Sequence, residues 1–329
     1  MSIVIGCSGS TGSSLLKTIL NRHSQLFAGP EAGLFAFPSL YKKWAAQKKI
    51  LLGKLKNDDW QMRKGMTLLQ PVFGWQASEL SDCITHSSSF KEFIYSYFAH
   101  TLRLHQKREW VAKTPANAAG LAAFLQYFPE GKVIHTVRNP YDTIASLMAR
   151  GYNAYWATAY YVYNTAIASA NRQHPRYYEV RYEELVQEPA NTLVELFDFL
   201  EIPFEEKIIT AKYEKRAEPT SMKGWKYQET ATIGASSIGR FQELSIDQQA
   251  LIQAAFTTFR IAPSFQKKKT ISTVSGQELC TLLGYEFLKN EHNDYHLLLR
   301  SQYWKDRLGR IRHGFYHQFW DYPGALNLS

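Results

Sequence analysis

Cysteine is scarce in this chain of 329 residues, which contains only Cys7, Cys83 and Cys280. No two of them have the CxxC spacing of a zinc ribbon or a redox pair. The low count argues against a disulfide framework, and the spacing argues against a structural zinc site. We therefore expect a protein of a reducing compartment.

Long apolar runs are missing as well. No run reaches the length of about eighteen residues that a membrane-spanning helix requires. No basic and apolar leader precedes the first expected strand, which begins at Ser2. We expect a cytoplasmic protein without a transmembrane segment.

Acidic residues are outnumbered, with 29 Asp and Glu against 38 Lys and Arg, a formal net charge of +9. This excess suits an anionic ligand, a membrane surface or a nucleic acid, and charge alone does not choose among them. The hydrophobic fraction of 45% and the charged fraction of 20% are ordinary for a globular protein. Nucleic-acid binding has only the net charge in its favour, so we rank it last.

A glycine-rich stretch follows the first apolar run. Residues 3–5 (IVI) predict a buried parallel strand, Gly6, Gly9 and Gly12 permit close backbone approach, and residues 13–16 begin a helix. The free amides in the first turn of such a helix point at an anion, so the stretch suits a phosphate. Taken alone, it is equally consistent with an ordinary joint between a strand and a helix.

The stretch departs from a Walker A loop in one position. A Walker A loop needs Lys directly after its last glycine, and here Gly12 is followed by Ser13 and Ser14. Nucleoside triphosphate hydrolysis of the usual kind is therefore disfavoured.

Further apolar runs complete a sheet, and most are followed by a helical pattern. Alternation of strands and helices along a chain is typical of an α/β fold with a parallel sheet flanked by helices, here P-loop-like. The expected strands are residues 26–28, 109–113, 132–137 and 177–181, and the expected helices are residues 116–127, 141–150, 189–200 and 245–259.

Polar residues follow several of these strands. Lys113 ends its strand, where it faces the crevice in which α/β sheets bind ligands, and Glu31 follows residues 26–28. Arg138 lies just past another strand, and Ser146 is eight residues further along, so both could reach one phosphate. Taken singly, Arg138 and Ser146 would be unremarkable, and a carboxylate that follows a strand, such as Glu31, is more often a surface residue.

Two regions depart from the alternating pattern. Residues 36–105 predict a helical insertion, and residues 261–329 form a basic, aromatic extension expected to pack on the core. Residues 212–234 predict a mobile loop, and an aromatic helix at residues 153–172 is expected in the core. The pairs His292 and His296, and His313 and His317, have a metal-ligand spacing but no evident third ligand, so we expect no metal.

Six motifs, in their order and spacing, resemble the sulfotransferase family, and most closely its bacterial and tyrosylprotein-sulfotransferase-like branch. The resemblance covers residues 2–260 and implies a sulfotransferase domain over residues 1–260, with 3′-phosphoadenosine 5′-phosphosulfate as donor. The motifs are GCSGSTGSSLL from Gly6, GPE ending at Glu31, AKTP around Lys113, HTVRNPYDTIAS from His135 to Ser146, VRYEELVQEP from Val180 and SSIGRF from Ser236.

The resemblance assigns the donor-binding residues. It implies that a planar guanidinium fork and a hydroxyl hold the 3′-phosphate, because such a fork donates two parallel hydrogen bonds. The implied contacts are Ser10, Thr11, Gly12, Ser13 and Ser14 for the phosphosulfate end, Arg138 and Ser146 for the 3′-phosphate with help from Arg150, Tyr182 for the adenine side, and Arg240 with Ser236 or Ser237 on a loop closing over the 3′-phosphate.

One position departs from the family. The first loop of the family usually carries Lys or Arg before the Ser/Thr-Gly pair, and this chain has Ser10. We expect Lys113 to supply the missing cation on the leaving phosphate and Glu31 to act as the base, without a metal.

The expected activity is sulfuryl transfer to a hydroxyl, or as second choice an amine, of a small molecule. Aromatic residues in the ranges 35–98 and 152–163 would wall a flat or partly apolar acceptor pocket. Two alternatives stay open, a family member that binds nucleotide without turnover and a P-loop-type kinase. A homodimer also stays open, because the sequence does not fix the oligomeric state.

Overall fold

The computed structural model describes residues 2–56, 61–63, 66–210, 233–261, 274–290, 295–313 and 326–328. The chain forms two compact units, each made of three segments. Unit 1 comprises Met1–Cys7, Gly12–Thr136 and Asn171–Ile233, and unit 2 comprises Ser8–Thr11, Val137–Ala170 and Gly234–Ser329. The expected boundary at residue 260 stays a prediction.

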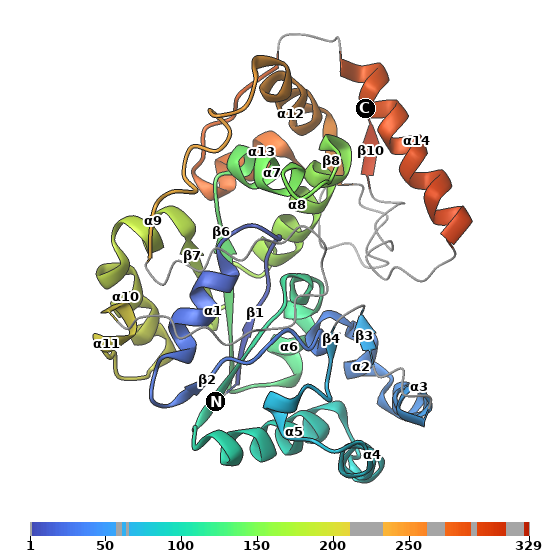
Figure 1. The fold of residues 1–329 in the computed structure, drawn as a ribbon, viewed down its shortest axis with the longest axis vertical. Helices are drawn as coiled ribbons and strands as arrows, with labels where there is room; N and C mark the ends of the chain where they lie inside the picture. Colours follow the sequence, from blue (N-terminus) through green and yellow to red (C-terminus); the bar gives the residue numbers. More distant parts are fainter. Residues whose placement is uncertain are drawn as a thin grey trace. The chain divides into compact units, whose positions relative to one another are not determined.

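A five-stranded sheet forms the centre of unit 1, in the order β2-β5-β1-β6-β7 (Figure 1). β1 pairs in parallel with β5 and β6, and β2 pairs in parallel with β5. The register sets Ile5 beside Lys113 and Ile134, so the carboxyl ends of β1 and β5 coincide. The predicted α/β fold with a parallel sheet is confirmed. The strands are β1 (Ser2–Ile5), β2 (Leu26–Phe27), β5 (Glu109–Lys113), β6 (Gly131–Val137) and β7 (Tyr177–Arg181).

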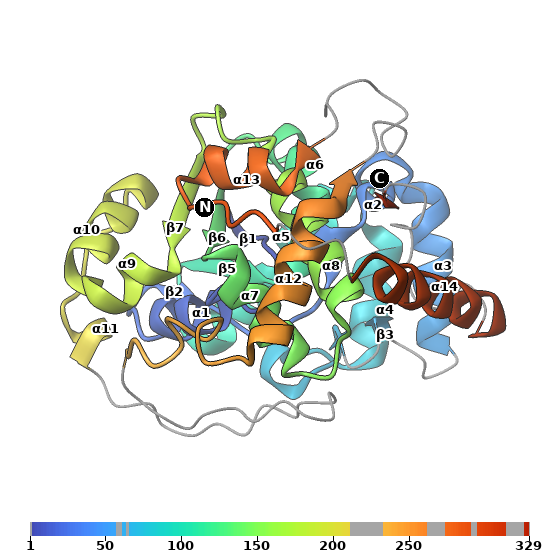
Figure 2. The ribbon, with the colours of Figure 1, turned by 90° about the horizontal axis from the view of Figure 1, so that it is seen from above.

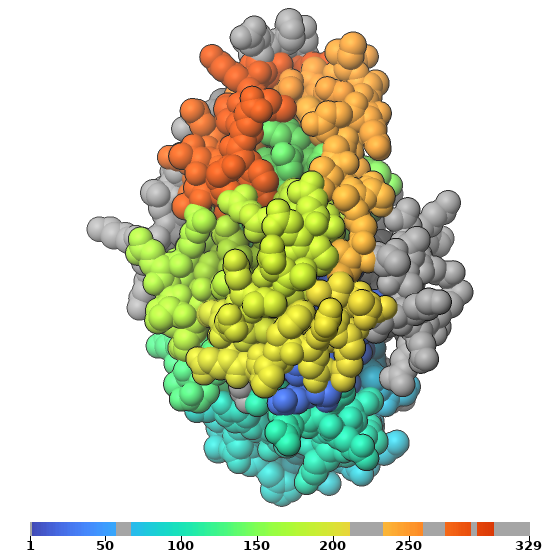
Figure 3. Space-filling view, turned by 90° about the vertical axis from the view of Figure 1, so that its left-hand side faces the viewer, coloured from blue at the N-terminus to red at the C-terminus, as the bar shows by residue number. Residues whose placement is uncertain are grey.

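Helices cover this sheet and bury its apolar side chains. Leu16, Ile19 and Leu20 of α1 (Ser13–Asn21) are fully buried in one cluster with Ile3 and Ile5 of β1. The predicted helix at residues 189–200 is confirmed as α10 (Pro189–Leu200). With α9 (Tyr182–Gln187) and α11 (Lys207–Thr210), α10 forms a layer next to β7, whose outer face is yellow-green to yellow in Figure 3.

The expected insertion is helical, but it also contains a short hairpin. Its aromatic side chains pack mainly on one another and on the sheet, since Phe35 and Phe98 stack on Trp110 at 5.3 and 4.1 Å between ring centroids. These rings are therefore core residues. The elements are η1 (Leu34–Ala36), α2 (Pro38–Lys42), α3 (Trp44–Lys56), β3 (Gln61–Arg63), β4 (Met66–Thr67), η2 (Pro71–Phe73), α4 (Ala77–His86) and α5 (Phe90–His105), and after β5 come η3 (Pro115–Gly120) and α6 (Leu121–Tyr127).

Unit 2 is built around the aromatic helix α8 (Ala154–Ser169), which is buried along nearly its whole length. Tyr155 and Tyr161 are fully buried, so the aromatic stripe belongs to the core as predicted. α12 (Ile246–Thr258) lies against α8 in both ribbon views (Figure 2). The remaining elements are α7 (Pro140–Met148), β8 (Phe259–Ile261), β9 (Val274–Ser275), α13 (Gly276–Leu283), α14 (His296–His313) and β10 (Leu326–Leu328).

The antiparallel sheet β10-β8-β9 of unit 2 was not predicted, because its strands have only two or three residues each. The predicted mobile loop at residues 212–234 lies almost wholly outside the described residues, as do His292 and His317. Within the described part of the chain, no helix is both long and apolar enough to cross a membrane.

Candidate functional site

The glycine-rich loop between β1 and α1 has two residues in the left-handed backbone region. Gly12, with φ of 85°, is the N-cap of α1, and because it has no side chain it leaves the first-turn amides of the helix uncapped. Ser10 has φ of 68°, which is uncommon for a residue with a Cβ atom. The Oγ of Ser10 is buried without a hydrogen-bond partner in the described structure. Such backbone geometry is concentrated at ligand sites.

Tyr182, expected on the adenine side, packs directly on Gly12. A Cβ atom added to Gly12 would lie 2.4 Å from Cδ2 of Tyr182, closer than any real contact. Tyr182 is buried and begins α9, directly after β7. Gly12 is thus required both by its backbone angle and by the tyrosine ring.

We expect Gly12→Ala to lower the free energy of unfolding by about 2–4 kcal/mol, because a left-handed alanine and an overpacked contact both cost energy. Gly151→Ala is the matched control, since Gly151 has φ of 91° and a Cβ there would meet no atom within 4 Å. That control should lose only about 1–2 kcal/mol. Urea unfolding of both variants measures the difference, and equal losses would rule out the contact with Tyr182.

Lys113 and Glu31, the two candidate catalytic residues, are in contact within unit 1. The Lys113 side chain is only 3% exposed, and its Nζ forms an ion pair with the Glu31 carboxylate and donates a hydrogen bond to Ser14 Oγ at 3.1 Å. Glu31 is 26% exposed. A buried cation, a carboxylate within reach of solvent and a hydroxyl of the first helical turn therefore form one cluster.

Two further residues, Thr114 and Asn117, hold the backbone around this cluster and were not among the predicted site residues. Asn117 donates from Nδ2 to the carbonyls of Ile5 at 3.1 Å and Ala112 at 3.2 Å, which ties together the ends of β1 and β5. Thr114 Oγ1 accepts a hydrogen bond from the Gly33 amide at 3.3 Å. The sequence signal that could have identified Thr114 and Asn117 is their position shortly after the strand that ends in Lys113.

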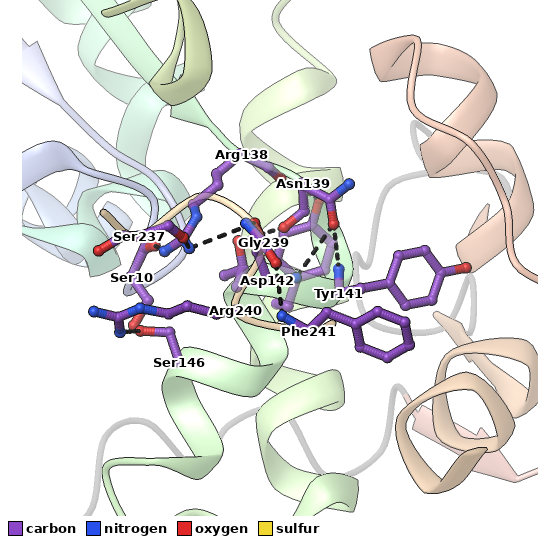
Figure 4. Close-up of polar contacts among 12 residues, drawn as sticks. Ser10, Arg138, Asn139, Tyr141, Asp142, Ser146, Ser237, Gly239, Arg240 and Phe241 are labelled. Atoms are coloured by element: carbon purple, nitrogen blue, oxygen red, sulfur yellow. Dashed lines mark hydrogen bonds and ion pairs between the residues drawn. The ribbon is translucent and has the colours of Figure 1, made fainter. Parts of the chain in front are cut away.

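Arg138 lies at the centre of a second polar cluster, in unit 2. It is 3% exposed, and its Nη1 donates to the Ser10 carbonyl at 3.0 Å while its Nη2 donates to the Ser237 carbonyl (Figure 4). Asn139 caps α7, since its Oδ1 accepts from the amides of Tyr141 at 3.0 Å and Asp142 at 3.2 Å. The cap holds Arg138 just before the helix and next to the first loop.

Ser146 and Arg240 belong to the same cluster. Arg240 Nη1 donates to Ser146 Oγ at 3.1 Å, and Ser146 is buried on α7 (Figure 4). Ser237, rather than the exposed Ser236, contacts Arg138. Of the residues assigned to the 3′-phosphate, the structure therefore brings together Arg138, Ser146 and Arg240.

Arg150 lies two residues past the end of α7 and is exposed. Its backbone amide donates a hydrogen bond to the Leu147 carbonyl at 3.0 Å. Its assisting role at the 3′-phosphate stays a prediction.

The Arg138 cluster brings two guanidinium groups close to a hydroxyl and a carboxylate. Asp142 Oδ2 is 3.7 Å from Nη2 of Arg138, and Arg240 Nη1 donates to Ser146 Oγ. Guanidinium groups beside a hydroxyl suit a phosphate dianion.

His135 precedes Arg138 in the HTVRNP motif but does not have the properties of a catalytic base. It is fully buried in β6, and its Nδ1 lies 2.6 Å from the Tyr177 hydroxyl. Burial lowers the pKa of His135 to about 3, so the imidazole is neutral near pH 7. Among the described residues, no group of three or more His, Cys, Asp or Glu could hold a metal ion.

The comparison with protein families matches the sulfotransferase family model to residues 2–206, which is more than half of the chain. The chain belongs to the sulfotransferase family. This confirms the resemblance found in the sequence motifs. The match spans β1 to the end of α10 and includes both polar clusters except for Ser237 and Arg240.

The curated relatives of this chain are distant. The chain is 28% identical over 124 residues to an uncharacterized protein of Aquifex aeolicus (strain VF5), covering 34% of this chain and 16% of that protein. It is 24% identical over 162 residues to a Caenorhabditis elegans protein named "Putative protein-tyrosine sulfotransferase", covering 44% of this chain and 62% of the relative. The chain therefore spans less than two thirds of either relative.

Two solved structures share the fold of this chain. The sulfotransferase domain from the curacin biosynthetic pathway is 20% identical with a TM-score of 0.56, and the alignment covers 87% of this chain and 98% of that domain. The sulfotransferase domain of the Synechococcus PCC 7002 olefin synthase is 19% identical with the same TM-score, covering 87% and 95%. At these identities the likeness extends to the fold alone.

Proposed function

We propose that this protein transfers a sulfuryl group from 3′-phosphoadenosine 5′-phosphosulfate to a hydroxyl of a small molecule. The observation that carries the proposal is the Arg138 cluster, in which two arginines and Ser146 gather beside the first loop. Family membership supports the same reaction class.

In the proposed donor complex, Arg138, Ser146 and Arg240 bind the 3′-phosphate. Gly12, Ser13 and Ser14 offer the amides and hydroxyls of the first turn of α1 to the 5′-phosphosulfate end, with Ser10 and Thr11 in the preceding loop. Tyr182 borders the adenine side. A doubly phosphorylated nucleotide suits these two sets of residues by their chemistry, because each set offers hydrogen-bond donors to one phosphate.

The proposed reaction is an in-line displacement at sulfur. The acceptor oxygen forms a bond to sulfur while the bond between sulfur and the 5′-phosphate oxygen breaks, and Glu31 takes the hydroxyl proton. Lys113 neutralises the charge that develops on the departing phosphate oxygen. Lys113 is buried and donates to Ser14 Oγ, a hydroxyl that the proposal places at the 5′-phosphosulfate end.

Phe35, Phe73 and Phe98, which lie in the range expected to wall the acceptor pocket, are buried and line only a cavity that is too small for an acceptor. The acceptor is therefore proposed by its reacting group alone, a hydroxyl.

The contact between Lys113 and Glu31 favours the second candidate function, nucleotide binding without turnover. In this arrangement the two opposite charges neutralise each other, and the base is engaged. For transfer to occur, donor binding must separate Glu31 from Lys113, so that the carboxylate can accept the proton of the acceptor hydroxyl. The P-loop kinase alternative has no such observation in its favour.

The test is calorimetric titration with adenosine 3′,5′-bisphosphate and with adenosine 5′-monophosphate, followed by labelled-donor assays on a panel of alcohols. We expect the bisphosphate to bind at least about tenfold more tightly, because each charge-assisted hydrogen bond to the 3′-phosphate contributes roughly 1.5–3 kcal/mol. Equal affinities would reject the proposed donor, and tight binding without transfer would leave the binding-only function.

A further inference from the structure

Asp142 is a buried carboxylate, and both of its oxygens accept hydrogen bonds from backbone amides of a single turn. Its Oδ2 accepts a hydrogen bond from the Gly239 amide and its Oδ1 accepts one from the Phe241 amide, each at 2.9 Å (Figure 4). Asp142 is 4% exposed and lies in the first turn of α7. The residue between the two amides is Arg240.

We infer that Asp142 is a positioning residue that fixes Arg240 at the 3′-phosphate and so sets the preference for a 3′-phosphorylated nucleotide. The inference rests on the proposed function, since it concerns the same site. Asp142 itself need not touch the donor.

The geometry supports this role because both flanks of Arg240 are held. Gly239 has φ of 83°, which forms the turn, and the buried Phe241 ring packs on Tyr141 at 5.1 Å between centroids. With its backbone fixed on either side, Arg240 reaches Ser146 Oγ. A guanidinium that is preorganised in this way loses less conformational entropy when it binds a phosphate.

A different role for Asp142 would be electrostatic, because its carboxylate lies 3.7 Å from Nη2 of Arg138. The two roles predict opposite changes in phosphate affinity when the charge of Asp142 is removed. If Asp142 only reduced the positive charge of the cluster, then removing its charge would strengthen binding of every anion there. If it positions Arg240, then removing its charge weakens binding of the 3′-phosphate in particular.

The experiment compares Asp142→Asn with Asp247→Asn, which removes an exposed carboxylate from the first turn of α12 in the same unit. Calorimetric titration of each protein with adenosine 3′,5′-bisphosphate and with adenosine 5′-monophosphate gives two dissociation constants, and their ratio is the preference for the 3′-phosphorylated nucleotide. We expect Asp142→Asn to weaken bisphosphate binding by about 10- to 100-fold and monophosphate binding by less than about threefold. Asp247→Asn should match the wild type.

A second arm tests whether Asp142 acts through Arg240. In an Arg240→Ala background, Asp142→Asn should cause little further loss of bisphosphate affinity, because residues that act through one another are not additive. An additive loss would overturn the inference, as would unchanged or tighter bisphosphate binding by the single variant.

Failure of the inference is separable from failure of the proposed function. A wild-type protein that does not prefer the bisphosphate would overturn both, whereas a preference that survives Asp142→Asn overturns only the role of Asp142. If thermal unfolding shows that Asp142→Asn does not fold, Gly239→Ala replaces it, since a Cβ there meets only Gln242 Oε1 at 3.5 Å while the turn angle is strained. Gly239→Ala should also lose the preference for the bisphosphate. If this variant kept the preference, the inference would be overturned.

Discussion

Lys113→Met should lower the rate of sulfuryl transfer by about 10²–10³-fold, as the loss of one fixed donor to a developing oxyanion typically does. Lys113 is buried, and in the proposed reaction it supplies the cation that the first loop lacks at Ser10. Methionine keeps most of the side-chain length and removes the charge, so the packing of β5 should change little. The rate is measured with labelled donor at saturation, and bound nucleotide is measured separately by calorimetry.

The matched control for this variant is Lys107→Met. Lys107 precedes β5 at the opposite end from Lys113, and its Nζ donates to the His23 carbonyl at 2.6 Å. The control removes the same charge from a partly buried lysine, and its transfer rate should stay near that of the wild type. A Lys113→Met protein with normal donor binding and near wild-type transfer would disprove the catalytic role.

Arg138→Lys should weaken binding of adenosine 3′,5′-bisphosphate by about 10²-fold even though the charge is kept, because an ammonium group cannot reproduce the planar fork of a guanidinium. Two ends of that fork now donate to the carbonyls of Ser10 and Ser237, which orients the group beside the first loop. Lysine would lose this orientation as well as the paired hydrogen bonds to phosphate.

Arg300→Lys provides the comparison, because Arg300 is exposed on α14 and the substitution is chemically the same. Calorimetry with the bisphosphate measures both variants, and thermal unfolding checks that each is folded. Equal affinities for Arg138→Lys and Arg300→Lys would remove Arg138 from the nucleotide site.

Much of the fold was predictable because its signals are local. The strands at Glu109–Lys113 and Tyr177–Arg181 and the helix at Pro189–Leu200 have the predicted bounds, since their apolar periodicity and their terminal Pro and Gly residues act over a few neighbours. The shortest elements were missed. The strands of the β10-β8-β9 sheet are too short to establish a period, and they exist through pairing with one another.

For the site, the sequence by itself determined which residue types follow each strand, and therefore that Lys113 and Arg138 stand at strand ends. Only the tertiary structure decided their partners, since Lys113 meets Glu31 across 82 residues. Likewise, the Asp142 carboxylate accepts from amides 97 and 99 residues away. Local periodicity cannot encode such contacts, because they depend on which strand ends and turns become neighbours when the sheet and the helices pack.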